Sequence, residues 1–413
     1  MSTPALERPA RPVPRHRATD LLAAYLPGSF FYSSTRGALL ADGVHAPVPA
    51  DRGRGGAGPR AGAAADALDA ARTAGVRDPL VVGALGFGPD AESSLVVPAV
   101  VRRAAPLGAA PPAEPGPAEP LQGWAVRQHP APEEYQAGVR RALALIDDGG
   151  LRKVVLARWL ELTAGQEVPV PALLRRLARA NPTAHAFAVD VTAPGDAATR
   201  TLVGASPELL VSRRGTEVVA NPLAGSLPRV PGTSAEAEAE NRRRIAALRA
   251  SDKDRREHAL VAAQVGEVLG RFCTDLHLPA EPEVIGTPTM WHLSSRILGR
   301  LPDPADPAVS SLGLAEALHP TPAVCGVPVP EARAVIADLE PVDRGYFTGL
   351  VGWTGPDGDG EWVVTIRSAE VSERTVRLFA GAGIVEGSRP EAELAETSAK
   401  FRTLLRAIGM EDE

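Results

Sequence analysis

Lysine is scarce in this chain of 413 residues: of its 44 lysines and arginines, only the residues at 153, 253 and 400 are lysine. Arginine keeps its proton in proteins, whereas burial can lower the pKa of a lysine from about 10.4 toward neutrality. Arginine therefore supplies the positive charge at most positions of this chain where only a fixed charge is needed. Each lysine is a candidate for proton transfer, and the alternative is that a few lysines persist by chance in an arginine-rich composition.

Other absences narrow the class of protein. Cys273 and Cys325 have neither metal-ligand spacing nor a CxxC pattern, so no disulfide framework or zinc site is predicted. No apolar run approaches the roughly 20 residues of a membrane span, and the N-terminus lacks the apolar core of a secretory signal. We therefore expect a cytoplasmic protein with no membrane partner. The nucleotide-binding pattern GxxxxGKS/T does not occur.

The charge balance points away from polyanionic partners. The net charge is −6, and basic residues are scattered once the arginine-rich start of the chain is passed. A protein that binds nucleic acid usually carries a clustered basic surface, so we expect no nucleic-acid partner. Small-molecule chemistry is the better expectation for a chain long enough to bury a large core.

Composition and periodicity divide the chain into three parts. Residues 1–18 are predicted to form a flexible arm, residues 19–124 an N-terminal part with Pro/Gly/Ala-rich loops at 51–63 and 104–120, and residues 125–413 the region that carries the chemistry. Helices are expected over 63–74, 133–148, 170–180, 234–272 and 389–408. Strands are expected over 80–86, 94–102, 151–162, 185–191, 200–212, 361–371 and 375–385, with a hairpin turn at Arg214 and Gly215.

Lys153 lies in the predicted strand 151–162. Alternation along a strand places it on the same face as Val155, Ala157 and Trp159. Apolar surroundings favour the neutral amine, which can act as a general base. The competing interpretation is a lysine at a strand end whose ammonium reaches water.

Glu208 follows Ser206 and Pro207 and precedes a run of apolar residues that begins at Leu209. The proline fixes the approach to a strand, so the carboxyl is expected to be partly buried. A buried carboxyl with a raised pKa can donate a proton to a departing hydroxyl. A carboxylate in an ordinary salt bridge is the alternative.

Two predicted helices each present a pair of carboxylates on one face. Asp254 and Glu257 are separated by three positions, as are Glu393 and Glu396, and Lys400 lies four positions after Glu396. Carboxylates without a His/Cys ligand set suit a hard cation, and Mg²⁺ takes one or two of them together with water and substrate oxygens. Solvated acid–base pairs on a helix surface are the alternative.

Arg367 lies in an apolar strand, so its charge is expected to face an anionic group. The neighbouring predicted strand ends in an Ala-Gly-Ala-Gly run at 380–383, where missing side chains expose backbone groups to a ligand. With Lys400 these features predict a carboxylate-binding site. A structural Arg–Glu pair beside a glycine bulge is the alternative.

Several sequence strings occur in one order along the chain. They are KVVLAR (153–158), GASPELL (204–210), PLAGS (222–226), DKDRREHALV (252–261), TPTMWHL (287–293), HPTPAVCG (319–326), LEPVDRGYFTGLVGW (339–353), GEWVVTIR (360–367), LFAGAGIV (378–385) and ETSAK (396–400). This order closely resembles the isochorismate synthases of the chorismate-utilising enzyme family. The resemblance covers roughly residues 125–410, and the N-terminal third matches in broad outline.

The resemblance implies a fold, an activity and a set of residue roles. The fold is α+β: a single large domain of two packed, mostly antiparallel β-sheets covered by outer helices. The activity is magnesium-dependent isomerisation of chorismate to isochorismate, with Lys153 as the base that activates water for attack on C2 and Glu208 as the acid that protonates the hydroxyl leaving C4. The implied magnesium ligands are Glu257 and Glu396, with Asp254 and Glu393 as secondary acidic residues. The implied substrate-binding residues are Arg367, Lys400, Gly381, Ser226, Ala323, Phe347 and His292.

Particular positions separate the members of this family. Aminodeoxychorismate synthases place a lysine where this chain has Ala224, which disfavours that activity. Salicylate synthases tend to carry threonine and tyrosine where this chain has Ala323 and Phe347, so salicylate synthase is the second choice among enzymes.

Partners and pathway are expectations from the same resemblance. Relatives that use ammonia draw it from a glutaminase partner or fused domain, and no obligatory glutaminase subunit is expected here. The motifs resemble those of siderophore-type enzymes, with the menaquinone pathway as the alternative, and a monomer is expected.

The third lysine, Lys253, matches a motif position without an assignable role and suits a solvated helix surface. A chorismate-binding or scaffolding protein without catalysis is the hypothesis from a different class.

Overall fold

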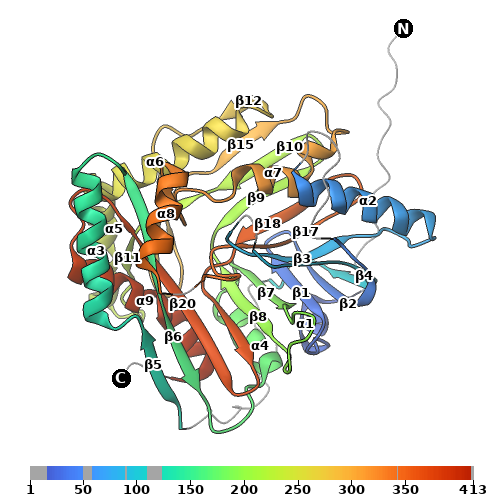
Figure 1. Ribbon diagram of the computed structural model, residues 1–413, viewed down its shortest axis with the longest axis horizontal. Helices are drawn as coiled ribbons and strands as arrows, with labels where there is room; N and C mark the ends of the chain where they lie inside the picture. Colours follow the sequence, from blue (N-terminus) through green and yellow to red (C-terminus); the bar gives the residue numbers. More distant parts are fainter. Residues whose placement is uncertain (1–15, 50–57, 89–90, 109–122, 342, 411–413) are drawn as a thin grey trace.

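The computed structural model describes residues 16–49, 58–88, 91–108, 123–341 and 343–410 (Figure 1). Its helices are α1 (Ala18–Ala23), α2 (Pro59–Thr73), α3 (Pro132–Asp147), α4 (Val170–Ala180), α5 (Ala235–Ala250), α6 (Asp252–Leu269), α7 (Ser311–Leu318), α8 (Val329–Leu339) and α9 (Pro390–Ile408), with a 3-10 turn at Pro307–Val309. Among the described helices, none is both long and apolar enough to cross a bilayer.

The strands of the N-terminal part and of the middle of the chain are β1 (Phe30–Ser34), β2 (Gly37–Pro47), β3 (Val81–Leu85), β4 (Ser93–Ala104), β5 (Ala125–His129), β6 (Lys153–Thr163), β7 (His185–Asp190), β8 (Thr201–Ser206), β9 (Leu209–Arg214), β10 (Glu217–Asn221) and β11 (Leu223–Pro228). Later strands are β12 (Thr274–His277), β13 (Glu283–Gly286), β14 (Met290–Ser294), β15 (Ile297–Arg300), β16 (Gly326–Val327), β17 (Leu350–Thr354), β18 (Gly360–Val364), β19 (Ser368–Ser372) and β20 (Thr375–Ile384).

Antiparallel pairing joins seventeen of these strands into one hydrogen-bonded network. One half runs in the order β12, β15, β10, β9, β18, β17, β3. The other half runs β1, β7, β8, β19, β20, β6, and both β5 and β16 pair with the outer edge of β6. The long strands β2 and β4 link the two halves. Strands β11, β14 and β13 form a separate small sheet.

The two halves pack face to face and helices cover their outer faces (Figure 1). The core between them contains Phe30, Tyr32, Phe187, Val351 and Val363, which come from strands of both halves. Helices α1, α4 and α9 close a second core on one half, and α2, α6 and α7 close a third on the other. The expected α+β fold of two packed antiparallel sheets with outer helices is confirmed, and β2 and β4 join the two sheets.

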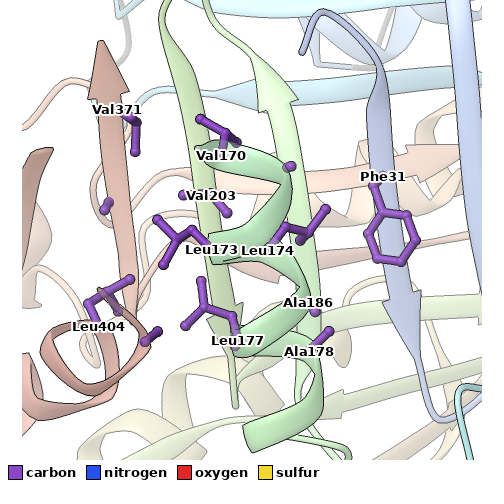
Figure 2. Packing of buried hydrophobic residues seen from close by; sticks show 14 of the residues in the cluster. Phe31, Val170, Leu173, Leu174, Leu177, Ala178, Ala186, Val203, Val371 and Leu404 are labelled. Atoms are coloured by element: carbon purple, nitrogen blue, oxygen red, sulfur yellow. The ribbon is translucent and has the colours of Figure 1, made fainter. Parts of the chain in front are cut away.

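Helix α4 shows how the sequence pattern produces this packing. Its apolar residues recur at spacings of three and four, so one stripe of the helix is apolar. Figure 2 shows Leu173, Leu174 and Leu177 directed at Val203, Ala186 and the neighbouring strands. Burying a leucine side chain stabilises a fold by roughly 1.5–3 kcal/mol, so this stripe anchors the helix on the sheet.

The helix predicted over 234–272 was wrong as a single element. It divides into α5 and α6 at Ser251, whose backbone is extended (φ −73°, ψ 110°) and whose side chain accepts a hydrogen bond from the Asp254 amide. Serine competes for backbone hydrogen bonds and caps helices, so it starts a new helix here. The break matters because α6, restarted at this point, directs Asp254 and Glu257 inward.

Other predicted boundaries also need correction. The strand predicted over 200–212 is interrupted between β8 and β9 at Pro207, because proline has no amide proton to donate to the ladder. The strand predicted over 361–371 divides into β18 and β19, with Arg367 in the left-handed region at φ 52°. Helix α2 begins at Pro59, inside the segment expected to be a loop at 51–63.

The remaining predicted helices and strands are found within a few residues of their expected bounds, and the hairpin turn lies at Gly215 and Thr216, one residue later than predicted. The arm predicted for 1–18 falls largely outside the described residues, and α1 begins at its end, with Ala18. Most of the loop predicted over 104–120 and the start of the one over 51–63 are likewise outside the described residues.

Candidate active site

One cavity gathers most of the predicted site residues. It lies where β11 and β14 of the small sheet meet β20, α6 and α9. The predicted site residues that line it are Glu208, Ser226, Glu257, His292, Ala323, Phe347, Arg367, Gly381, Glu396 and Lys400. Three further predicted residues lie just behind the lining. Lys153 contacts the lining residue Glu257, and Asp254 and Glu393 interact electrostatically with lining carboxylates.

Lys153 is the first residue of β6 and its side chain is fully buried. Its ammonium Nζ lies 2.9 Å from Oε1 of Glu257, which lines the cavity. The contact is an ion pair by distance, and Nζ makes no hydrogen bond of good geometry to any residue that the structure describes. The interpretation of Lys153 as an ammonium reaching water from a strand end is therefore wrong.

Gly383 makes this ion pair possible, and sequence reasoning missed it. A Cβ atom at Gly383 would lie 2.1 Å from Oε1 of Glu257 and 2.9 Å from Cε of Lys153. Real Cβ atoms do not approach so closely, so any side chain here would displace the two charged groups. The Ala-Gly-Ala-Gly run was the available signal, but alternation alone does not tell which glycine faces a charged pair.

Glu208 lies between β8 and β9 and is 2% exposed. Burial raises the pKa of this carboxyl to about 7, although a backbone hydrogen bond from Leu223 and the charges of Lys153 and Lys400 act against the shift. A carboxyl with this pKa holds its proton in a substantial fraction of molecules near neutrality. It has the property required of a general acid, and no arginine or lysine forms an ion pair with it among the described residues.

Each of the three lysines pairs with a glutamate in or beside the cavity. Lys153 lies 2.9 Å from Glu257, and Lys400 of α9 lies 2.6 Å from Glu396 in the same helix. Lys253 lies 2.8 Å from Glu393, which is 1% exposed. The solvated-surface interpretation of Lys253 is therefore wrong: the carboxylates of Glu393 and Glu257 outweigh the effect of burial and raise the pKa of Lys253.

The carboxylates of α6 and α9 approach one another across the cavity wall. Burial raises the pKa of Asp254, and Glu257 and Glu396 add to the shift through their charges. Burial, followed by the charge of Glu396, also raises the pKa of Glu393. For Glu396 burial acts in the raising direction, but Lys400 outweighs it and the pKa is lowered. The acidic residues that the sequence singled out on the two helices therefore lie close enough to act on one another electrostatically.

The donor set fits a hard divalent cation. Oε2 of Glu393 is buried and has no hydrogen-bond partner among the described residues, although Oε1 of the same carboxylate pairs with Lys253. Within the described part of the chain, no three His, Cys, Asp or Glu side chains stand close enough to hold a metal ion by themselves. Mg²⁺ needs one or two carboxylates and takes the remaining oxygens from water and substrate, so Glu257 and Glu396 could hold it.

Arg367 supplies a fixed positive charge to the cavity. It is 6% exposed, and burial lowers its pKa to about 10, well above neutrality. Its guanidinium donates to the Lys400 carbonyl oxygen at 3.1 Å and to Nε2 of His292 at 3.4 Å. Burial and the charge of Arg367 hold the pKa of His292 well below its usual range, so the imidazole is neutral. No carboxylate pairs with Arg367 among the described residues, which disfavours the structural Arg–Glu pair.

Ser226 and Gly381 complete the polar lining. The Ser226 hydroxyl donates to Oε1 of Glu396 at 3.0 Å, which fixes the orientation of that carboxylate. The Gly381 carbonyl oxygen accepts a hydrogen bond of 2.8 Å from Nζ of Lys400. Lys400 is thus held between a carbonyl and a carboxylate, with its ammonium at the cavity surface. We call the side chains of Lys153, Lys400, Glu257 and Glu396, with Lys253 and Glu393 behind them, the charged wall.

Another part of the cavity surface is apolar. Ala323, Phe347 and Phe379 line it, and we call these residues the apolar wall. The rings of Phe347 and Phe379 stack with centroids 5.1 Å apart and planes 16° from parallel. A cavity lined by cations, carboxylates and stacked aromatic rings suits a small anionic ring compound.

Known proteins resemble this chain over most of its length. A sequence model described as chorismate binding enzyme matches residues 95–409, so the chain belongs to the chorismate binding enzymes. The chain is 49% identical over 396 residues to isochorismate synthase DhbC of Bacillus subtilis (strain 168), covering 96% of this chain and 97% of that protein. It is 48% identical over 282 residues to the vibriobactin-specific isochorismate synthase of Vibrio cholerae, covering 68% of each.

The fold agrees with a solved structure. The DhbC protein of Bacillus anthracis, described as a 2,3-dihydroxybenzoate-specific isochorismate synthase, superposes with a TM-score of 0.86 at 42% identity, covering 95% of this chain and 100% of that chain. The family resemblance found in the ordered sequence motifs is therefore confirmed.

Proposed function

We propose that this chain is an isochorismate synthase. In the reaction the oxygen of a water molecule bonds to C2 of chorismate, the ring double bonds shift, and the bond between C4 and its hydroxyl oxygen breaks. Lys153, in its neutral amine form, takes a proton from the attacking water, and Glu208 gives a proton to the hydroxyl that leaves as water. The product is an isomer of the substrate, so no oxidant or reductant is required.

The observation that carries this proposal is the state of Glu208. A carboxyl whose pKa burial raises to about 7 can protonate a leaving hydroxyl at neutral pH, which an ordinary surface glutamate cannot do. Lys153 is close enough for its charge to act on Glu208, so acid and base belong to one site. Proton transfer by such groups typically contributes about 10²–10⁴-fold to a rate.

The charged groups of the cavity match the two carboxylates of chorismate. Arg367 and Lys400 are proposed to bind one of them, with His292, Ser226 and the Gly381 backbone shaping the site around it. Glu257 and Glu396 are proposed to hold Mg²⁺, with Asp254 and Glu393 as supporting acidic residues. When bound, the ion would supply positive charge that orients a substrate carboxylate.

Salicylate synthase is the second candidate, because pyruvate elimination can follow isochorismate formation on the same scaffold. The apolar side chains of Ala323 and Phe347 offer no hydroxyl to the bound ring, which favours release of isochorismate. The names of the vibriobactin-specific relative and of the 2,3-dihydroxybenzoate-specific solved structure favour a pathway to a 2,3-dihydroxybenzoate-type siderophore over menaquinone. A monomer without a glutaminase subunit is part of the proposal.

Product analysis tests the proposal. Purified protein is incubated with chorismate, with and without Mg²⁺, and the products are resolved by chromatography and mass spectrometry. Magnesium-dependent isochorismate without salicylate is the expected result. Salicylate with pyruvate would establish the second candidate, and binding of chorismate without turnover would instead indicate a protein without catalysis.

A further inference from the structure

The backbone beside the apolar wall is strained at Thr348. This residue lines the cavity, is 1% exposed and lies in the left-handed region at φ 59°. A β-branched residue rarely adopts this conformation, and it persists only where surrounding contacts hold it. The strained residue directly follows Phe347, so the contacts that hold it also set the direction of the Phe347 ring.

Three hydrogen bonds to residues beyond its immediate chain neighbours hold Thr348. Its amide donates to the Thr365 carbonyl at 2.8 Å, and its carbonyl accepts from Nε2 of His319 at 2.8 Å. Burial lowers the pKa of His319 to about 4, so its imidazole is neutral. The Thr348 hydroxyl accepts a hydrogen bond of 3.3 Å from Nη1 of Arg344.

Arg344 and Glu340 form a buried ion pair behind the apolar wall. Their side chains are 3% and 6% exposed, and Nε of Arg344 donates to Oε2 of Glu340 at 2.8 Å. The guanidinium also donates to the carbonyls of Val324 at 2.7 Å and Val155 at 2.8 Å. Oε1 of Glu340 accepts the Ala157 amide at 2.8 Å.

The pair therefore ties together three segments that meet at the cavity. These are β6 through Val155 and Ala157, the loop of Ala323 through Val324, and the loop of Phe347 through Thr348. The planar guanidinium can make these contacts at once because it carries five N–H donors in a fixed arrangement, whereas the ammonium of a lysine carries three.

We propose that Glu340 and Arg344 are positioning residues that fix the apolar wall, and with it the strained backbone of Thr348, for productive binding of the substrate ring. Neither side chain lines the cavity, so both act through the residues they hold. The inference rests on the proposed function for its kinetic consequence, while its structural consequence can be measured without any substrate.

The structural test is amide hydrogen exchange of the full chain after the substitution Arg344→Lys. The matched control is Arg213→Lys, which alters another buried arginine, one that donates to the carbonyls of Gly215, Val309 and Asp357, away from the cavity. Arg344→Lys should speed exchange in 321–325 and 344–349 together and leave 304–309 unchanged, and Arg213→Lys should do the reverse. Unchanged exchange in either cavity segment would overturn the proposal.

The kinetic test compares the same variants at a temperature where both are folded by circular dichroism. Because a misplacement of about 1 Å can cost about 10²-fold in rate, Arg344→Lys should lower kcat/KM by about tenfold or more relative to Arg213→Lys. A second substitution, Thr348→Gly, removes the need to hold a β-branched residue at positive φ. When Thr348→Gly is added to Arg344→Lys, kcat/KM should rise about threefold or more above that of Arg344→Lys alone. Such non-additivity is expected for two residues that act on the same backbone conformation.

The possible outcomes separate the two proposals. Equal kcat/KM for Arg344→Lys and Arg213→Lys, or strictly additive losses in the double variant, would make Glu340 and Arg344 structural and overturn their positioning role. If the wild-type chain forms no isochorismate, the proposed function fails, and the exchange pattern alone then decides whether the pair fixes the wall.

Discussion

The two walls of the cavity are built on different principles. The charged wall brings lysine ammonium groups into direct contact with carboxylates, as in the pairs of Lys153 with Glu257 and Lys400 with Glu396. The apolar wall contains no charged side chain, and its shape depends on the buried pair of Glu340 and Arg344 behind it. The charged wall thus carries the proposed base and metal ligands, and the apolar wall contributes shape.

Lysine and arginine residues also occupy different positions relative to the cavity. The lysines belong to the charged wall, whereas most of the buried arginines described above hold the backbone or side chains of segments behind the cavity surface. Arg158 illustrates this: its guanidinium donates to Thr397 at 2.7 Å and to Ser398 at 2.6 Å, in the turn of α9 between Glu396 and Lys400. An arginine suits this task because it keeps its charge and makes several hydrogen bonds at once. Arg367 is the exception, an arginine at the cavity itself.

Replacing Lys153, the proposed base, should cause the largest loss of activity of any substitution in the charged wall. We expect Lys153→Ala and Lys153→Arg each to lower kcat by about 10²–10⁴-fold, because alanine has no base and arginine does not release its proton. Lys153→Arg keeps a positive charge beside Glu257, so it separates proton transfer from charge balance. Steady-state assays on folded variants measure the effect, and substantial activity in Lys153→Arg would rule out Lys153 as the base.

Adding one methyl group at Gly383 should disturb the same wall by sterics alone. A Cβ atom there would lie 2.1 Å from the Glu257 carboxylate, so Gly383→Ala should separate Glu257 from Lys153 and lower kcat/KM by about 10–100-fold. Gly266→Ala is the control, because its Cβ atom would meet its nearest neighbour at 3.5 Å. Equal activity of the two variants would contradict the assigned contact.

The pH dependence of activity tests Glu208. Its pKa of about 7 means that the protonated acid is lost as the pH rises, so kcat/KM should fall about fivefold between pH 7 and pH 8. The slower variant Glu208→Gln should lack this decline, because an amide does not titrate in this range. A decline that survives in Glu208→Gln would assign it to another group.

The smallest effect is expected behind the charged wall, at Lys253. Its removal in Lys253→Ala leaves the buried Glu393 carboxylate without its ion-pair partner, which should lower the free energy of unfolding by about 1–3 kcal/mol. Arg141→Ala breaks an exposed pair with Asp338 and should cost less than about 1 kcal/mol. Urea denaturation compares the two variants, and equal midpoints would show that Lys253 has no special structural role.

Sequence reasoning found the charged wall and missed the support of the apolar wall, for a physical reason. Rare lysines and acidic residues at helical spacing are visible in a sequence, and so Lys153, Glu257, Glu396 and Lys400 could be named. The contacts of Arg344 are mainly to backbone carbonyls, which every residue has, so nothing in the sequence marks their partners.

The fold shows the same limit. Periodicity predicted most helices and strands, whereas the breaks at Ser251, Pro207 and Arg367 depend on capping, a missing amide and a left-handed backbone. These breaks position α6, Glu208 and the arginine of the cavity. The sheet partners of each strand, joined through β2 and β4, depend on contacts distant in sequence that periodicity does not encode.

Isotope labelling tests the central claim most directly, namely that Lys153 activates water against C2 while Glu208 releases the C4 hydroxyl. The wild-type chain is given chorismate in water enriched in oxygen-18, and isochorismate is collected early, before the reverse reaction contributes. The account predicts that each isochorismate carries oxygen-18 in its C2 hydroxyl group. Isochorismate that retains the original hydroxyl oxygen would contradict it, because the hydroxyl would then have migrated within the substrate without solvent water.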